Sequence, residues 1–119
     1  MADLRFVGLF GAFGVMFGAF GAHVLEGRVS PERLQTWETA SRYHLVMAVA
    51  LLVLVTLPQV PRRALQAIAA GTLVFAGSLY LLVLLDQPWL GAVTPLGGLL
   101  LIGGWASLGF VARTPRVGG

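Results

Sequence analysis

The stretch FVGLFGAFGVMFGAFGAHVL, residues 6–25, decides the class of this protein, because it contains no Asp, Glu, Lys or Arg. A helix of about 20 apolar residues crosses a hydrocarbon core of roughly 30 Å. A secretory signal peptide has a shorter apolar run, of about 7–15 residues, behind a basic end, and here Asp3 offsets Arg5. We therefore interpret this stretch as a first membrane span.

The composition of the whole chain is that of an integral membrane protein. Of its 119 residues, 57% are hydrophobic and only 11% are charged, against about 25% charged in soluble domains. This excludes a soluble domain and a disordered chain, and the lack of cysteine excludes a disulfide-stapled module and thiolate metal sites. We expect no metal and no cofactor.

The same composition predicts three further spans, at residues 38–57, 64–85 and 95–112. Pro58 and Pro61 end the second span, Asp86 and Pro88 end the third, and Thr94-Pro95 marks the start of the fourth as a cap followed by a proline. We therefore predict an all-α fold: an integral membrane four-helix bundle that forms one domain over residues 1–119.

An amphipathic segment, residues 31–42, leads into the second span. Ser30 and Pro31 are typical of an N-cap and a first helical position. The segment either continues as one long helix or lies at the interface and bends into the membrane. Leu34, Trp37 and Ala40 or Ser41 share one face of this segment, whereas Arg33, Gln35, Glu38 and Arg42 lie largely elsewhere. Trp37 and Tyr43 are expected at the membrane–water interface.

The arginines are spread along the loops and form no basic stripe, so we interpret them as topology determinants and lipid-phosphate anchors, with the bilayer and not nucleic acid as partner. Four spans place the termini and the middle loop on one side, with five arginines against three on the other. The five are Arg5, Arg62, Arg63, Arg113 and Arg116, and the three are Arg28, Arg33 and Arg42. This predicts the cytoplasmic (inner) membrane, with both termini in the cytoplasm.

Glycines recur at helical spacing in the first and fourth spans. They are Gly11, Gly14, Gly18 and Gly21 in the first, and Gly97, Gly98 and Gly104 in the fourth. Glycine destabilises a helix interior by about 1 kcal/mol, but in a membrane it lets a second backbone come close. We expect these two spans to pack together or across a subunit boundary; a lipid or cofactor groove is the alternative. The adjoining phenylalanines, Phe17 among them, are expected to face lipid or a looser contact.

Five ionisable side chains form a candidate polar cluster near the outer interface: His23, Glu38, Arg42, His44 and Asp86. Arg42 needs a counter-charge there, which Glu38 or Asp86 can supply as a structural clasp or as part of a site. Each histidine either hydrogen-bonds a carbonyl or carboxylate, or serves as a ligand or proton relay. Ser78 and Tyr80 are predicted to hydrogen-bond between helices.

The chain lacks the motifs of membrane and soluble enzymes: it has no nucleophile elbow, paired intramembrane carboxylates, zinc helix motif or phosphate loop. This favours a non-enzymatic scaffold or accessory subunit, in a homo-oligomer or a larger membrane complex. The alternatives are a transporter or binding protein for a small ligand, lipid or proton that uses the polar cluster, and a lipid-active enzyme at the outer interface.

Several segments carry a family resemblance. They are GAFGAH at residues 18–23, SPER at 30–33, GSLYL at 77–81, GAVTPLGG at 91–98, and the pairs Glu38-Thr39, Arg42-Tyr43 and Gly104-Trp105. Taken in chain order, these segments cover almost the whole chain and resemble a small membrane family of unknown function that includes bacterial inner-membrane proteins and the eukaryotic transmembrane protein 256. The resemblance implies a four-helix membrane protein and no activity. Members of that family tend to have a histidine where this chain has Met47, and this chain has His44 one turn earlier.

Overall fold

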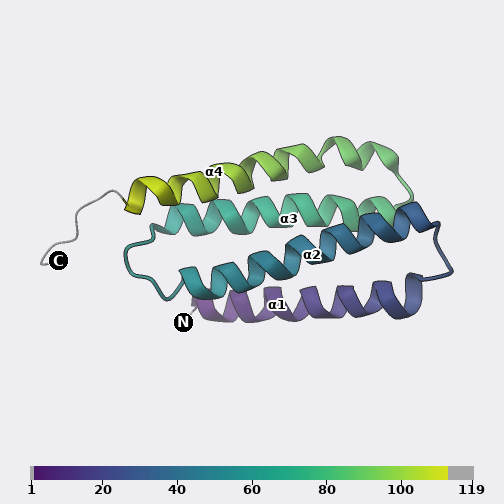
Figure 1. The fold of residues 1–119 in the computed structure, drawn as a ribbon, viewed down its shortest axis with the longest axis horizontal. Helices are drawn as coiled ribbons and strands as arrows, with labels where there is room; N and C mark the ends of the chain where they lie inside the picture. The colour runs from purple at the N-terminus through teal and green to yellow at the C-terminus, as the bar shows by residue number, and fades with distance from the viewer. Residues whose placement is uncertain (1, 113–119) are drawn as a thin grey trace, which may run out of the picture.

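The computed structural model describes residues 2–112, and these residues form four α-helices and no strand. The helices are α1 (Ala2–Phe20), α2 (Pro31–Leu54), α3 (Arg62–Leu85) and α4 (Thr94–Ala112), as Figure 1 shows. A π-helical turn, η1 (Gly21–Leu25), extends α1, and a 3-10 helix, η2 (Pro88–Ala92), precedes α4. The all-α prediction is confirmed.

Helix α2 runs without a break over 24 residues, so the amphipathic segment and the second predicted span form one long helix. The Ser30 hydroxyl accepts a hydrogen bond from the Arg33 amide at 3.1 Å, and Pro31 occupies the first turn, as the sequence indicates. The helix ends at Leu54, three residues before the predicted end of the span.

Three helical segments in the described part of the chain are long and apolar enough to cross a membrane: Asp3–Leu25, Arg62–Leu85 and Pro88–Phe110. Helix α2 is about 36 Å long at 1.5 Å per residue, but its first half is too polar to qualify. It nevertheless lies alongside α1 and α3 over most of its length (Figure 1). Its crossing as a fourth span stays a prediction.

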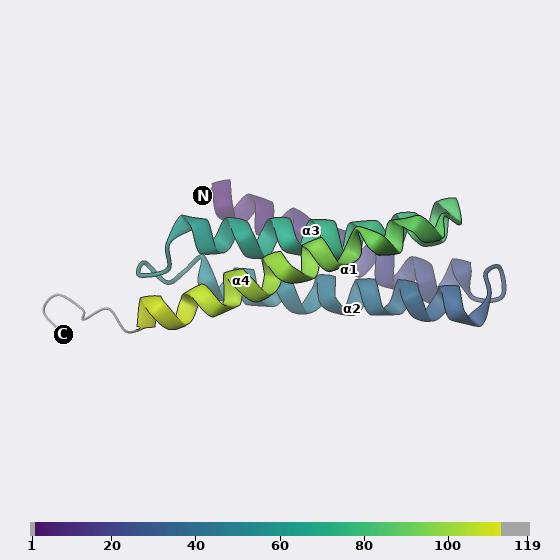
Figure 2. The ribbon, with the colours of Figure 1, turned by 90° about the horizontal axis from the view of Figure 1, so that it is seen from above.

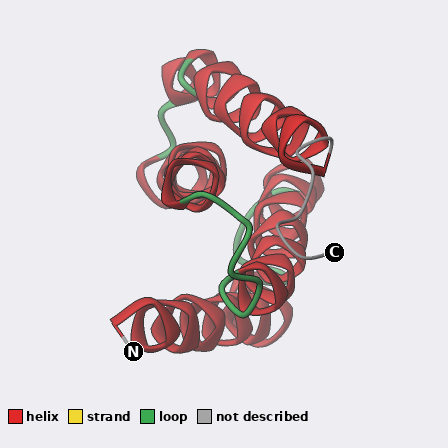
Figure 3. Ribbon diagram, turned by 90° about the vertical axis from the view of Figure 1, so that its left-hand side faces the viewer, coloured by secondary structure: helices red, strands yellow, loops and turns green. Residues whose placement is uncertain are grey.

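The helices pack in chain order. Helix α1 contacts α2, α2 contacts α3, and α3 contacts α4, whereas α1 and α4 do not contact each other. The end-on view shows α1 and α4 at opposite edges, and the view from above shows α4 crossing over α3 at an angle (Figures 2 and 3). The expectation that the first and fourth helices pack together within one chain is therefore wrong, because short loops make each helix the neighbour of the next. A contact across a subunit boundary stays a prediction.

Three glycines of α1 lie against α2. A Cβ at Gly11 would lie 3.7 Å from the Ala48 methyl group, and one at Gly14 would lie 2.9 Å from the Leu45 side chain. Gly18 faces Ser41 at 4.0 Å. The two helices thus approach along a face that has almost no side-chain volume on the α1 side.

Three glycines of α4 lie against α3. A Cβ at Gly97 would overlap the Phe75 backbone and lie 2.8 Å from the Gly71 carbonyl oxygen. One at Gly104 would lie 2.8 Å from the Ile68 side chain, whereas Gly98 is only in ordinary contact, at 3.9 Å, with the Phe75 ring. At Gly97 the closest atoms are backbone atoms, which cannot move aside as a flexible side chain can.

Candidate functional site

The charged residues at the η1 end of the bundle do not gather as predicted. The Asp86 carboxylate pairs with the Arg33 guanidinium at 3.0 Å, and 83% of the Asp86 side chain is exposed. Arg42 is exposed and forms no ion pair with a described carboxylate. The predicted partner of Asp86 is therefore wrong, because Arg33 in the first turn of α2 lies beside the end of α3, and Arg42 lies about 13 Å further along α2.

The other members of the predicted cluster are also dispersed. His23 in η1 and Glu38 in α2 are exposed, and neither side chain makes a hydrogen bond or ion pair with another described residue. An exposed pair such as Arg33–Asp86 contributes at most about 1 kcal/mol. This end of the molecule therefore holds one solvated ion pair and scattered charges, with no assembled site among the described residues.

His44 lies apart from those four residues, inside the bundle. Only 5% of it is exposed. Its Nε2 donates to the Phe10 carbonyl oxygen at 2.8 Å, so in the neutral ring Nδ1 accepts from the Tyr80 hydroxyl at 3.0 Å. His44 thereby joins α1, α2 and α3, and both of its ring nitrogens have partners in the protein.

Trp37 is the most enclosed large side chain of this region, with 1% of it exposed. Its Nε1–H donates to the Phe17 carbonyl oxygen at 2.6 Å, and its indole lies where a Cβ on Gly21 would stand. The wider π-helical turn η1 begins at Gly21. The missing side chain at Gly21 leaves a space for the indole between α1 and α3. The position of Trp37 relative to the membrane–water interface stays a prediction.

Phe17 is half-buried and packs against other aromatic rings. Its ring lies 4.7 Å from the Tyr80 ring and 6.0 Å from the Trp37 ring, measured between centroids. The expectation of a looser contact for Phe17 is therefore wrong. Trp37 explains why Phe17 is packed there, because its indole contacts both the end of α1 and the last two turns of α3.

Two further side-chain contacts join neighbouring helices. The Ser78 and Thr94 hydroxyls lie 2.6 Å apart and link α3 to the start of α4. Thr94 is itself the first residue of α4 and also donates to the Leu90 carbonyl oxygen, so it does not act as the predicted N-cap. Trp105 Nε1 donates to the Met47 sulfur at 3.3 Å, which links α4 to α2. Met47 and His44 thus have different partners.

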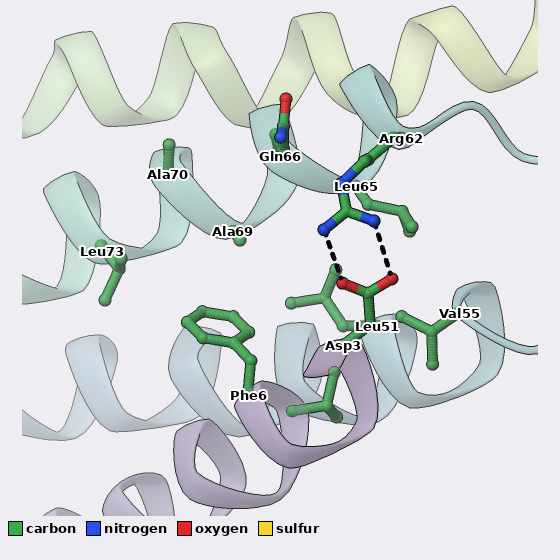
Figure 4. Close-up of a pocket in the computed structure, with 11 residues that line it drawn as sticks. Asp3, Phe6, Leu51, Val55, Arg62, Leu65, Gln66, Ala69, Ala70 and Leu73 are labelled. Atoms are coloured by element: carbon green, nitrogen blue, oxygen red, sulfur yellow. Dashed lines mark hydrogen bonds and ion pairs between the residues drawn. The ribbon is translucent and has the colours of Figure 1, made fainter. Parts of the chain in front are cut away.

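A groove opens between α1 and α3, which are not in direct backbone contact. Its wider stretch encloses about 510 Å³ and is shown in Figure 4. A second cavity of about 260 Å³ lies next to it between the same two helices, and Leu73 lines both. The walls are Phe6, Phe10, Phe13 and Phe17 on α1, and Leu65, Ala69, Ala70, Leu73, Ala76 and Gly77 on α3. The floor is formed by α2, and the lining is mainly apolar, with Asp3, Arg62 and Gln66 as the polar residues of the wider stretch.

Side chains tie the two walls together at both ends of the groove. At one end the Arg62 guanidinium binds the Asp3 carboxylate through two contacts, at 3.2 and 3.4 Å (Figure 4). At the other end the Phe17 ring packs on the Tyr80 ring. No local sequence pattern indicates this groove, since Asp3 and Arg62 are 59 positions apart.

The described residues form no group of three or more His, Asp or Glu side chains that could hold a metal ion. Every buried side-chain nitrogen and oxygen in this part of the chain has a hydrogen-bond partner. Two features could therefore bind a ligand or a partner. One is the apolar groove, with Asp3 and Arg62 at the end that we call its mouth, and the other is the outward face of α4, which points away from α3.

An all-α chain in which three helical segments are long and apolar enough to cross a membrane has the fold class of an integral membrane protein. Residues 17–98 match the family described as "Protein of unknown function (DUF423)". The chain belongs to this family, which confirms the resemblance noted in the sequence.

Bacterial membrane proteins are similar over most of the chain. The UPF0382 membrane protein YwdK of Bacillus subtilis is 41% identical over 97 residues, covering 76% of this chain and 79% of that protein. The UPF0382 membrane proteins SAB0533 of Staphylococcus aureus and SH2409 of Staphylococcus haemolyticus are 41% and 38% identical over 95 residues, each covering 76% of this chain and 78% of its own length. No solved structure matches the chain.

Proposed function

We propose that this protein is a non-enzymatic scaffold or accessory subunit of the membrane, which binds a partner helix through the outward face of α4. The observation that supports this is the placement of Gly103 and Gly109. A Cβ at either glycine would have no described atom within 4 Å, and Ala106 between them is exposed.

Glycine in a helix interior is unfavourable by about 1 kcal/mol relative to alanine. At Gly97 and Gly104 this cost is offset because α3 packs closely against them. Gly103 and Gly109 have no such neighbour within the described chain. Small residues on the lipid-facing side of a helix allow a second helix to come close. The partner is a second copy of this chain or a helix of a larger membrane complex.

Gly103→Leu tests this proposal. We expect the amount of a slowly migrating complex on blue-native gels to fall by about tenfold or more in this variant, because the new side chain separates the two helices. Its melting temperature as a monomer should be unchanged, since the position is open. Gly8→Leu, the same change at a glycine of α1 whose Cβ would also have nothing within 4 Å, is the control and should assemble normally. A wild-type chain that migrates only as a monomer would contradict the proposal.

The packing glycines of α1 give this proposal no further support, because Gly14 and Gly21 lie against the chain's own α2. The alternative function, a transporter or binding protein for a small ligand, lipid or proton, requires the polar cluster near the outer interface. It has less support, because Glu38 and Arg42 are exposed on α2 and only Asp86 of the cluster has an ion pair.

We also propose that the protein lies in the cytoplasmic membrane with both termini in the cytoplasm. The arginine excess at the termini and the middle loop supports this orientation; Arg113 and Arg116 lie outside the described residues. A reporter fused after residue 119 should behave as cytoplasmic, and one inserted after Arg28 as external. The reverse pattern would contradict the orientation.

A further inference from the structure

We propose that the groove between α1 and α3 binds one anionic phospholipid, with an acyl chain along the groove and the phosphate beside Arg62 and Arg63. This inference is independent of the α4 face. It rests on the shape of the groove, on the ties at its two ends and on the charge at its mouth.

The groove has the length and chemistry of an acyl-chain site. Between Asp3 and Phe17 the rise of α1 amounts to about 21 Å, which is more than half of a hydrocarbon core of roughly 30 Å. Aromatic rings form the α1 wall, and small residues such as Ala69 and Gly77 leave space on the α3 side. A lipid tail that enters from one leaflet is therefore covered along most of its length.

The side-chain contacts that join α1 to α3 at the two ends of the groove, which we call the ties, favour a flexible hydrocarbon chain over a helix as the occupant of the groove. The Asp3–Arg62 pair and the Phe17–Tyr80 contact each join α1 to α3. A helix with its side chains is about 10 Å wide and would have to break both ties to lie between the walls. A single hydrocarbon chain fits between the ties and leaves them intact.

The charge at the mouth of the groove selects the headgroup. The described residues at this end carry three arginines against one aspartate, a net charge of +2: Arg5, Arg62, Arg63 and Asp3. The opposite end carries three arginines against four acids, a net charge of −1: Arg28, Arg33, Arg42, Glu26, Glu32, Glu38 and Asp86. Basic pockets between helices bind anionic headgroups.

The Asp3–Arg62 pair does not block this site. The Arg62 side chain is 68% exposed, and two of its five N–H donors suffice for the carboxylate. The remaining donors and the exposed Arg63 side chain can bind a phosphate. Asp3 then holds Arg62 in place at the mouth.

Photocrosslinking in a mixed bilayer tests the occupant. The full chain, with benzoylphenylalanine at Leu73, is placed in nanodiscs of equal parts phosphatidylglycerol and phosphatidylcholine with the same acyl chains. We expect the phosphatidylglycerol adduct to exceed the phosphatidylcholine adduct by about tenfold. The control is the same substitution at Leu84, which is on the same helix, is also 54% exposed and lies outside the groove; there both adducts should form equally.

Four variants separate the headgroup from the groove. The double change Arg62→Gln with Arg63→Gln should abolish the lipid preference at Leu73, whereas Asp3→Asn, which removes the negative charge beside Arg62, should retain it. Ala70→Phe fills the groove and should abolish the lipid adducts, whereas Ala12→Phe, at an exposed position of α1 outside the groove, should not. Equal labelling by the two lipids, a covalent dimer, or an adduct with another protein would overturn the proposal.

Discussion

Replacing Trp37 by alanine should lower the free energy of unfolding by about 3–5 kcal/mol, the range for removing a large aromatic side chain from a core. Only 1% of Trp37 is exposed, and its indole fills the space between Gly21, Phe17 and Tyr80. The change empties this space and removes the donor to the Phe17 carbonyl. Thermal melting in detergent, followed by circular dichroism, measures the effect.

Trp89 supplies a matched control on the same protein. It is 64% exposed, so Trp89→Ala should change the melting temperature little. Trp37→Phe keeps a ring in the space but leaves the Phe17 carbonyl without its indole donor, and we expect it to cost about 1 kcal/mol. Equal losses for Trp37→Ala and Trp89→Ala would show that Trp37 is not the core residue described above.

Gly97→Leu should prevent α4 from packing on α3. A side chain there meets the Phe75 backbone and the Gly71 carbonyl oxygen, so the helices must move apart along their whole contact. Overpacking of a core usually costs about 1–3 kcal/mol, and we expect at least the upper value because the clash is with backbone. Fluorescence-detected size-exclusion chromatography after heating measures the surviving folded fraction.

Gly98→Leu is the neighbouring comparison, since a Cβ there would lie in ordinary contact at 3.9 Å from the Phe75 ring. We expect it to be far milder than Gly97→Leu. Together with Gly103→Leu, the three variants separate packing inside the chain from packing against a partner. If Gly97→Leu and Gly98→Leu melt alike, the close approach at Gly97 is wrong.

The sequence by itself determined the class, the number of helices and most of their boundaries. Apolar length settles where helices lie, because a bilayer leaves no water to bind an unpaired backbone amide. Ser30 and Pro31 also fixed the start of α2, since capping depends on residues that are adjacent in the chain. These are local properties, and periodicity and capping residues report them directly.

Only the tertiary structure decided which faces meet. The glycines of α1 could have served α4 or a partner helix, and the Gly21–Trp37 contact places them on α2. Arg42 was adjacent to Glu38 on one helix, yet Arg33 is the residue that reaches Asp86. The groove depends on Asp3 and Arg62 in two helices that do not pack on each other. Such contacts depend on the rotation and offset of whole helices, which no single stretch of sequence specifies.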